Sequence, residues 1–199
     1  PKECTAVLHM GACSSTTERD ADYLMDNNAR YTVELAKLCR EADIPFIYAS
    51  SAATYGTGEL GYDDSIDQLE NLRPLSMYGY SKHLSDLWMK RQGLFDHAIG
   101  FKFFNVFGVN EYHKGNMRSM ILKAWEQLQE CGRVKLFASH RDGHEDGTET
   151  RDFIYVKDIA QSVVHALTQK CPGGLYNMGS GVPRTFSDVV KAVFKALDR

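Results

Sequence analysis

The stretch Phe46-Ile47-Tyr48-Ala49-Ser50-Ser51 is typical of an apolar strand that ends in small hydroxyl residues. Further along the chain, Tyr78-Gly79-Tyr80-Ser81-Lys82 opens a helical run. Residues four apart on a helix lie on one face, so Tyr78 and Lys82 present a phenol and an ammonium side by side. A strand end that delivers Ser51 beside this helix completes a predicted three-part site.

The chemistry of such a site follows from the tyrosine. A free tyrosine has a pKa of about 10. A neighbouring positive charge favours the phenolate, so Lys82 is expected to lower the pKa of Tyr78. A phenol tuned in this way is a candidate general acid and base for a substrate hydroxyl, with Ser51 hydrogen-bonded to the same oxygen. The Y-x-x-x-K spacing by itself favours a tyrosine packed on a lysine stem, and it is the preceding strand that supports the catalytic interpretation.

Strands alternate with helices along the rest of the chain, which predicts an α/β fold with a parallel sheet. Further strands are predicted at residues 5–9, 99–103, 134–137, 151–156 and 175–178, and helices at residues 21–41, 117–130, 157–168 and from 185 onward. In such sheets, ligands bind at the carboxyl ends of the strands. Ser51 and Asn105 should therefore lie on the same edge of the sheet.

Two features of the first half of the chain require interpretation. Residues 56–61 match the letters G-x-G-x-x-G, but no helical pattern follows them, so we predict a loop and not a dinucleotide fingerprint. Asn27 and Asn28 lie in the middle of a predicted helix, where asparagine is a poor helix former. They are expected to fix an active-site backbone or a water, the alternative being a solvated polar turn.

The composition limits the class of protein. The chain has 199 residues, 43% hydrophobic and 25% charged, with a net charge of −3 that argues against a nucleic-acid partner. No apolar run approaches the length of a membrane helix. Five cysteines without a C-x-x-C motif predict reduced thiols and a cytoplasmic protein. The histidines and carboxylates of residues 140–149 lack a metal-ligand spacing, so we predict a surface loop and no metal site.

Several motifs together carry a resemblance to a known family. They are His9-Met10-Gly11-Ala12, Tyr48-Ala49-Ser50-Ser51, Tyr78-Gly79-Tyr80-Ser81-Lys82, Phe104-Asn105-Val106-Phe107-Gly108 and Arg151-Asp152-Phe153-Ile154-Tyr155-Val156. The chain resembles the nucleotide-sugar branch of the extended short-chain dehydrogenase/reductases, which have a Rossmann-like doubly wound parallel sheet and a smaller substrate-binding domain. Residues 11–18, 25–28 and 113–117 are similar to the ADP-glyceromanno-heptose 6-epimerases within that branch.

The resemblance implies an NADP-dependent epimerase that inverts C6″ of ADP-D-glycero-D-manno-heptose by transient oxidation, for the lipopolysaccharide core. It implies two acid/base residues, Tyr78 and Lys114, because the ketone must offer its other face before the hydride returns. It also implies a homo-oligomer, a pentamer. The implied cofactor-binding residues are Met10, Gly11, Ala12, Cys13, Ser14, Asn27, Lys82, Val106 and Lys114. The implied substrate-binding residues are Ser51, Asn105, Asn116, Lys123, Phe137, Ala138, Ser139, His140 and Arg151.

The chain also departs from the family pattern. Asn116 stands where many relatives carry serine, and Lys123 stands where some carry histidine. The family's N-terminal strand with its glycine-rich loop, and its C-terminal tail, have no counterpart here, so we expect an internal fragment with weak or no NADP binding and an exposed sheet edge. Residues 1–108 are expected to belong to the NADP-binding domain and residues 109–199 mostly to the substrate domain, with 151–180 returning to the Rossmann sheet.

Two alternatives remain open at this stage. One is another nucleotide-sugar enzyme, either a UDP-hexose 4-epimerase or a dehydratase. Dehydratases usually have Thr-Asp-Glu where this chain has Ser51-Ala52-Ala53, which counts against them. The other is a non-catalytic Rossmann-like scaffold with a relict site, against which the intact Ser51, Tyr78 and Lys82 argue.

Overall fold

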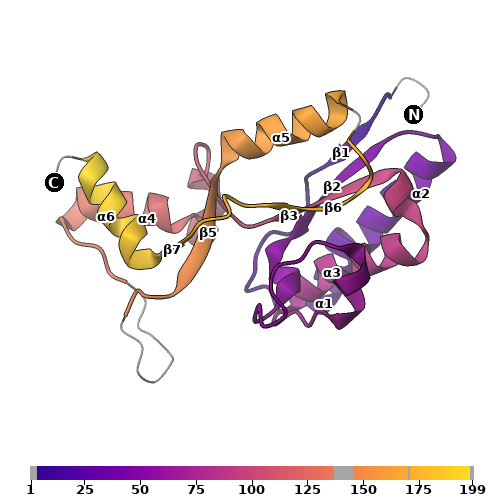
Figure 1. Cartoon of the computed structure of the whole chain (residues 1–199). Helices are drawn as coiled ribbons and strands as arrows, with labels where there is room; N and C mark the ends of the chain where they lie inside the picture. The colour runs from indigo at the N-terminus through magenta and orange to yellow at the C-terminus, as the bar shows by residue number, and fades with distance from the viewer. Residues whose placement is uncertain (1–3, 137–145, 170, 198–199) are drawn as a thin grey trace. The chain divides into compact units, whose positions relative to one another are not determined.

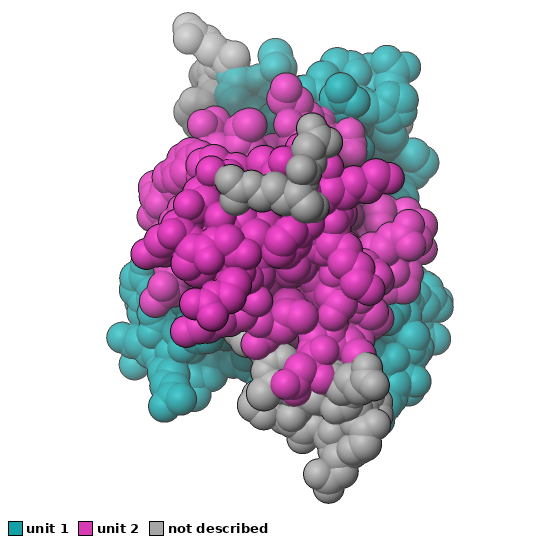
Figure 2. All heavy atoms as spheres, turned by 90° about the vertical axis from the view of Figure 1, so that its left-hand side faces the viewer, with its two compact units in different colours: residues 1–103, 161–178 teal, residues 104–160, 179–199 magenta. Residues whose placement is uncertain are grey.

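The computed structural model describes residues 4–136, 146–169 and 171–197. The chain forms two compact units, which Figure 2 colours separately. Unit 1 comprises Pro1–Phe103 and Gln161–Met178, and unit 2 comprises Phe104–Ala160 and Gly179–Arg199. Among the residues described, no helix has the length and apolar character needed to cross a membrane.

Unit 1 is built on a four-stranded sheet in the order β1-β2-β3-β6, with every pair of neighbours parallel (Figure 1). The strands are β1 (Val7–His9), β2 (Phe46–Ser51), β3 (Ala98–Phe103) and β6 (Gly174–Met178). The central strands β2 and β3 are buried at nearly every position, as expected for a parallel sheet covered on its faces. The predicted α/β class with a parallel sheet is confirmed, and β1 lies at one edge of the sheet as expected.

The helices of unit 1 bring the predicted site residues to the sheet. Helix α3 (Met77–Arg91) begins after Ser76, whose hydroxyl accepts a hydrogen bond from the Gly79 amide at 3.1 Å. The other long helix is interrupted: α1 (Ala21–Leu24) continues into the π-helical η1 (Met25–Arg30) and then into α2 (Tyr31–Glu41). Both α2 and α3 contact β2, and Figure 1 shows them in one layer.

Short 3-10 helices complete unit 1. They are η2 (Ala52–Tyr55), η3 (Ile66–Asn71) and η4 (Leu94–Asp96). The G-x-G-x-x-G sequence at residues 56–61 forms turns, as predicted, and all three of its glycines have positive φ angles.

Unit 2 contains a small sheet in which β4 pairs with β5 in parallel and β5 pairs with β7 in antiparallel orientation. Its strands are β4 (Asn105–Phe107), β5 (Thr150–Tyr155) and β7 (Pro183–Thr185). Its helices are η5 (Tyr112–Met117), α4 (Met120–Cys131) and α6 (Phe186–Ala196). Helices α4 and α6 share a core around Met120, Ala124 and Val190. Helix α5 (Val156–Thr168) begins in unit 2 and ends in unit 1.

Some predicted elements differ from the observed ones. Ser51 is paired in register with Phe103 at the end of β3, but Asn105 starts β4 and belongs to unit 2. Only β6 of the segment 151–180 joins the four-stranded sheet, because β5 pairs with β4 and β7. Sequence analysis did not detect β7, and α4 begins after Ser119, three residues later than predicted.

The strand predicted at residues 134–137 is absent from its described part, residues 134–136. The Lys135 amide donates to the side-chain oxygen of Gln127 on α4 at 2.9 Å, and so it is satisfied without a neighbouring strand. Val134 and Leu136 pack against the core shared by α4 and α6. The apolar pattern that predicted a strand therefore reflects packing against a helix pair.

Gly173 precedes β6 and is expected to be essential for the stability of unit 1. A Cβ atom added at Gly173 would lie 1.8 Å from the Phe95 backbone oxygen, whereas one added at Gly11 would meet nothing within 4 Å. Overpacking typically costs about 1–3 kcal/mol. We expect Gly173→Ala to lower the urea midpoint of unfolding strongly, because backbone must move, and Gly11→Ala to leave it unchanged. Equal midpoints for the two variants would contradict this packing.

Candidate functional site

The predicted trio lies in unit 1, at the carboxyl end of β2. Ser51 ends that strand, and its hydroxyl accepts a hydrogen bond from the Ala53 amide at 3.1 Å. Tyr78, in the first turn of α3, is buried, and its phenol is hydrogen-bonded with Ser51. Lys82 is also buried, and its Nζ donates to the Ala49 carbonyl oxygen at 2.8 Å. The site thus places two hydroxyls together and a buried ammonium one helical turn away.

The electrostatics of the trio differ from the sequence-based expectation. Burial raises the pKa of Tyr78, and the hydrogen bond with Ser51 opposes this rise. The prediction of a lowered pKa for Tyr78 is wrong in direction, because desolvation disfavours the phenolate. Burial also lowers the pKa of Lys82 to about 8, against the opposing effect of the Asp86 carboxylate.

Asn28 holds the loop that follows β1. Its side-chain oxygen accepts from the Cys13 amide at 2.8 Å, and its Nδ2 donates to the Cys13 carbonyl at 3.0 Å and to Ser81 Oγ at 2.9 Å. Ser81 in turn donates to the Tyr78 carbonyl at 2.7 Å. The Asn28 side-chain amide therefore ties the predicted cofactor loop, residues 10–14, to helix α3.

The role expected of the two asparagines thus belongs to Asn28. Asn27 is exposed, and its Nδ2 donates to the Tyr23 carbonyl at 2.8 Å. Asn28 has no exposed surface and lies in the π-helical turn η1. A π-helical turn is often found at a functional site, because it redirects side chains and backbone oxygens. The Asn28 carbonyl accepts hydrogen bonds from Thr32 at 2.6 Å and Ser85 at 3.2 Å.

A buried histidine extends this arrangement toward β1. His9 Nε2 lies 2.9 Å from Thr32 Oγ1. Since the Thr32 hydroxyl donates to the Asn28 carbonyl, its oxygen accepts from an Nε2–H group of His9. Burial lowers the pKa of His9 to about 4, and the positive charge of Lys82 acts in the same direction. His9 is therefore a neutral donor at physiological pH.

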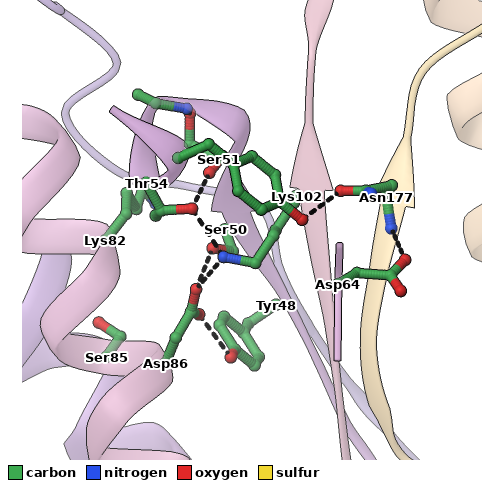
Figure 3. A network of polar contacts seen from close by, with 12 residues as sticks. Tyr48, Ser50, Ser51, Thr54, Asp64, Lys82, Ser85, Asp86, Lys102 and Asn177 are labelled. Atoms are coloured by element: carbon green, nitrogen blue, oxygen red, sulfur yellow. Dashed lines mark hydrogen bonds and ion pairs between the residues drawn. The ribbon is translucent and has the colours of Figure 1, made fainter. Parts of the chain in front are cut away.

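Behind the trio lies a polar network that sequence analysis missed; we call it the Asp86 network (Figure 3). It consists of Tyr48, Ser50, Thr54, Asp86 and Lys102. Asp86 and Lys102 form an ion pair at 3.0 Å, and their side chains are 0% and 1% exposed. Lys102 could have indicated this network from the sequence, because it is a charged residue within the apolar stretch Ile99-Gly100-Phe101-Lys102-Phe103.

The predicted residues of the second half of the chain lie in unit 2. Lys114 and Asn116 are exposed on η5, and Lys123 Nζ donates to the Asn116 carbonyl at 2.7 Å. Glu111 anchors this segment, because its carboxylate accepts from the Gly108 amide at 2.8 Å and from the Ser119 amide at 2.6 Å.

The remaining predicted residues are on β4 and β5 or outside the described ranges. Asn105 and Val106 pair with Phe153 and Ile154. The guanidinium of Arg151, at the start of β5, lies 5.6 Å from the centroid of the Phe186 ring. Phe137, Ala138, Ser139 and His140 fall outside the described residues.

Unit 2 also contains a cavity of about 580 Å³, lined mainly by aromatic and aliphatic side chains. Its residues come from β4, the loop after it, η5, α4, β5 and α6, and include Phe107, Tyr112, Trp125 and Tyr155. The substrate-binding residues predicted within the described part of unit 2 do not line it.

Comparison with known proteins agrees with this arrangement. Residues 1–179 match the NAD dependent epimerase/dehydratase family. The chain is 52% identical over 199 residues to ADP-L-glycero-D-manno-heptose-6-epimerase of Nitratidesulfovibrio vulgaris, which covers all of this chain and 62% of that relative. It is 50% identical over 194 residues to the enzyme of the same name from Fusobacterium nucleatum, covering 96% of this chain and 58% of that relative. The chain thus spans less than two thirds of these relatives' length.

Solved structures show the same fold. The crystal structure of Helicobacter pylori ADP-L-glycero-D-manno-heptose-6-epimerase has a TM-score of 0.84 and 27% identity, over 98% of this chain and 60% of that chain. Thermus thermophilus UDP-glucose 4-epimerase in complex with NAD has a TM-score of 0.79 and 25% identity, over 99% of this chain and 63% of that chain.

The two hydrogen bonds between the Asn28 side chain and the Cys13 backbone form a clamp on the loop. Substitutions of Asn28 and of its exposed neighbour Asn27 test this clamp. Asn28→Leu leaves the Cys13 amide and carbonyl without their partner, and an unsatisfied buried group costs about 1–3 kcal/mol. We expect faster amide exchange at residues 10–14 and a lower free energy of unfolding. Asn27→Leu removes only the bond to the Tyr23 carbonyl and should leave both unchanged. Exchange that is equally slow in both variants would refute the clamp.

The buried Lys82 predicts a pH dependence of stability. Its pKa falls from 10.5 to about 8 on folding, so between these values the unfolded chain binds more protons. The free energy of unfolding, relative to Lys82→Met, should be lowest and constant below pH 8 and should rise from there toward pH 10. Chemical denaturation at several pH values measures this difference, and a difference that stays flat across the window would show that Lys82 is not desolvated.

Proposed function

Because the chain belongs to the NAD dependent epimerase/dehydratase family, we propose that it epimerises C6″ of ADP-D-glycero-D-manno-heptose to give the L-glycero-D-manno product. The observation that carries the proposal is the hydroxyl pair of Ser51 and Tyr78 at the end of β2, one helical turn from the Lys82 ammonium. The 50–52% identity to enzymes named ADP-L-glycero-D-manno-heptose-6-epimerase supports this choice of substrate.

The residues of unit 1 fit a nicotinamide cofactor, which we propose to be NADP. Residues 10–14 follow the carboxyl end of β1, and space is open where a Cβ of Gly11 would be. The Lys82 ammonium has three donors, one of which goes to the Ala49 carbonyl, and the others suit ribose hydroxyls. Met10, Gly11, Ala12, Cys13 and Ser14 would line the cofactor, with Asn27 and Val106 near it. When bound, the cofactor supplies a reversible hydride acceptor.

The proton chemistry is assigned to Tyr78. Ser51 would hold the substrate oxygen while Tyr78 takes its proton and later returns one. The raised pKa of Tyr78 keeps the phenol protonated, which is the form that donates to a ketone. Acting as a base requires the phenolate, which the hydrogen bond with Ser51 favours against the effect of burial.

Inversion requires a second proton carrier on the opposite face of the ketone, and we propose Lys114 for this role. Glu111 fixes the segment that carries it. Lys114 would also contact the cofactor, whose positive charge in the oxidised form favours a neutral amine.

Substrate recognition is assigned to other residues of unit 2. Arg151 suits the diphosphate, because a guanidinium binds such groups through two parallel hydrogen bonds. Asn105, Asn116 and Lys123 would contact the sugar, together with residues 137–140. Lys123, one of the two departures from the family pattern, donates to the backbone carbonyl of Asn116, the other departure.

The resemblance further supports a cytoplasmic homo-oligomer, proposed to be a pentamer, that serves lipopolysaccharide core biosynthesis. The division of roles is proposed to follow the two units, with the cofactor on unit 1 and most substrate contacts on unit 2.

The second candidate is a UDP-hexose 4-epimerase. The fold similarity to the Thermus thermophilus UDP-glucose 4-epimerase favours it, and the Ser51–Tyr78 pair would serve either reaction. The two candidates differ at Lys114, since a 4-epimerase needs no second base there.

The test is epimerisation of ADP-D-glycero-D-manno-heptose, followed by NMR at C6″. Two proteins should be assayed. One is the chain as it stands, and the other is a chimera in which this chain replaces the matching 199 residues of the Nitratidesulfovibrio vulgaris relative. We expect turnover that is lost in Tyr78→Phe and falls by about 10²-fold or more in Lys114→Ala, as for general acid–base residues. The control is Lys157→Ala, an exposed lysine of α5.

Full activity in Lys114→Ala would favour the 4-epimerase, to be checked with UDP-glucose. NADP binding without turnover of either substrate would favour the non-catalytic scaffold with a relict site.

A further inference from the structure

The Asp86–Lys102 pair has an unusual environment for two charges. Both residues are 0% exposed, and the ion pair joins helix α3 to strand β3 at 3.0 Å. Removing two charges from water is expensive, and the attraction between them offsets this cost only when further hydrogen bonds satisfy the remaining groups. In other proteins, well-packed apolar side chains have often replaced a buried ion pair without loss of stability. The ion pair therefore suggests a role in positioning.

The carboxylate of Asp86 is fully engaged. Tyr48 donates to its Oδ1 at 2.8 Å, and Ser50 and Lys102 donate to its Oδ2 at 2.7 and 3.0 Å. Asp86 lies four residues after Lys82 on the same helix. One carboxylate thus fixes the catalytic helix against two side chains of β2.

Lys102 carries the connection around to Ser51. Its Nζ donates to Thr54 Oγ1 at 2.6 Å, and Thr54 Oγ1 donates to the Ser51 carbonyl at 2.8 Å (Figure 3). Ser51 is thereby held on both sides: its neighbour Ser50 bonds to Asp86, and its own carbonyl is reached through Thr54. Both routes lead back to the helix that carries Tyr78.

The far side of Lys102 is also fixed. Its ammonium lies 4.9 Å from the centroid of the Tyr55 ring, and Tyr55 donates to Asn177 Oδ1 on β6 at 2.7 Å. The Asn177 amide donates to Asp64 at 2.7 Å. The ammonium therefore has partners on η2 and α3, and Tyr55 links it to β6. These contacts leave it little freedom to move.

We propose that Thr54, Lys102 and Asp86 are positioning residues that hold the Ser51 hydroxyl at its place beside Tyr78. None of the three needs to touch the substrate, since their effect passes through the backbone of Ser51. This inference rests on the proposed function, because it assigns the network a task in the reaction of that site. A displacement of the order of 1 Å at such a group lowers a rate by about 10²-fold.

The decisive comparison is Thr54→Val with Thr54→Ser. Valine keeps the shape of threonine but removes the hydroxyl that links Lys102 to the Ser51 carbonyl, whereas serine keeps it. In the epimerase assay we expect Thr54→Val to lower kcat about tenfold or more while KM stays within about twofold. Thr54→Ser should restore kcat. A purely structural role would lower the melting temperature and leave kcat, measured well below melting, unchanged.

A double-mutant cycle shows whether Thr54 acts through Ser51. Ser51→Ala and Ser51→Ala/Thr54→Val should have the same kcat, because the hydroxyl to be positioned is already gone. Effects of the two substitutions that multiply would overturn the proposal. Asp86→Asn should behave as Thr54→Val does in the same cycle.

A readout without catalysis separates this proposal from the proposed function. The Ala53 amide donates to Ser51 Oγ at 3.1 Å, so its hydrogen exchange reports on the position of that hydroxyl. We expect faster exchange in Thr54→Val than in Thr54→Ser. If the unmodified protein does not epimerise ADP-heptose, the proposed function fails, and the exchange rates still decide whether Thr54 positions Ser51. Equal rates in the two variants would refute the positioning role.

Discussion

The arrangement of unit 1 depends on one buried carboxylate. Asp86 has no contact with water, so each of its acceptor positions must be filled by a donor from the protein. The donors come from Tyr48 and Ser50 on β2 and Lys102 on β3, so Asp86 joins α3 to both central strands of the sheet. Because Tyr78 and Lys82 are on the same helix, the bonds of Asp86 also place these two proposed catalytic residues near Ser51.

A second constraint acts on the other side of α3. Asn28 uses both Nδ2 donors and its side-chain oxygen to join the Cys13 backbone to Ser81. The π-helical turn η1 directs the Asn28 carbonyl to the hydroxyls of Thr32 and Ser85. The segment η1 thus departs from regular α-helical hydrogen bonding over one turn. Asn28, in this turn, fixes the proposed cofactor loop to helix α3.

Burial and charge compete at the site, and burial has the larger effect. It raises the pKa of Tyr78 and lowers that of Lys82 to about 8, so Lys82 gives up its proton more readily than Tyr78 does. The same burial keeps His9 neutral, so the positive charge of the site is concentrated on Lys82.

The sequence by itself determined the alternation of strands and helices and the parallel sheet, because these follow from local periodicity. It also grouped Tyr78 with Lys82 by their spacing on one helix, and Ser51 with them by its position at the end of a strand. It also indicated that the asparagine pair has a side-chain role. Only the tertiary structure decided that Asn28 has that role, that residues 134–136 pack on α4 and α6 without forming a strand, and that Asp86 pairs with Lys102. These features depend on burial and on contacts between residues distant in sequence, such as Asn28 with Ser81, and no local pattern encodes which polar group meets which partner once water is excluded.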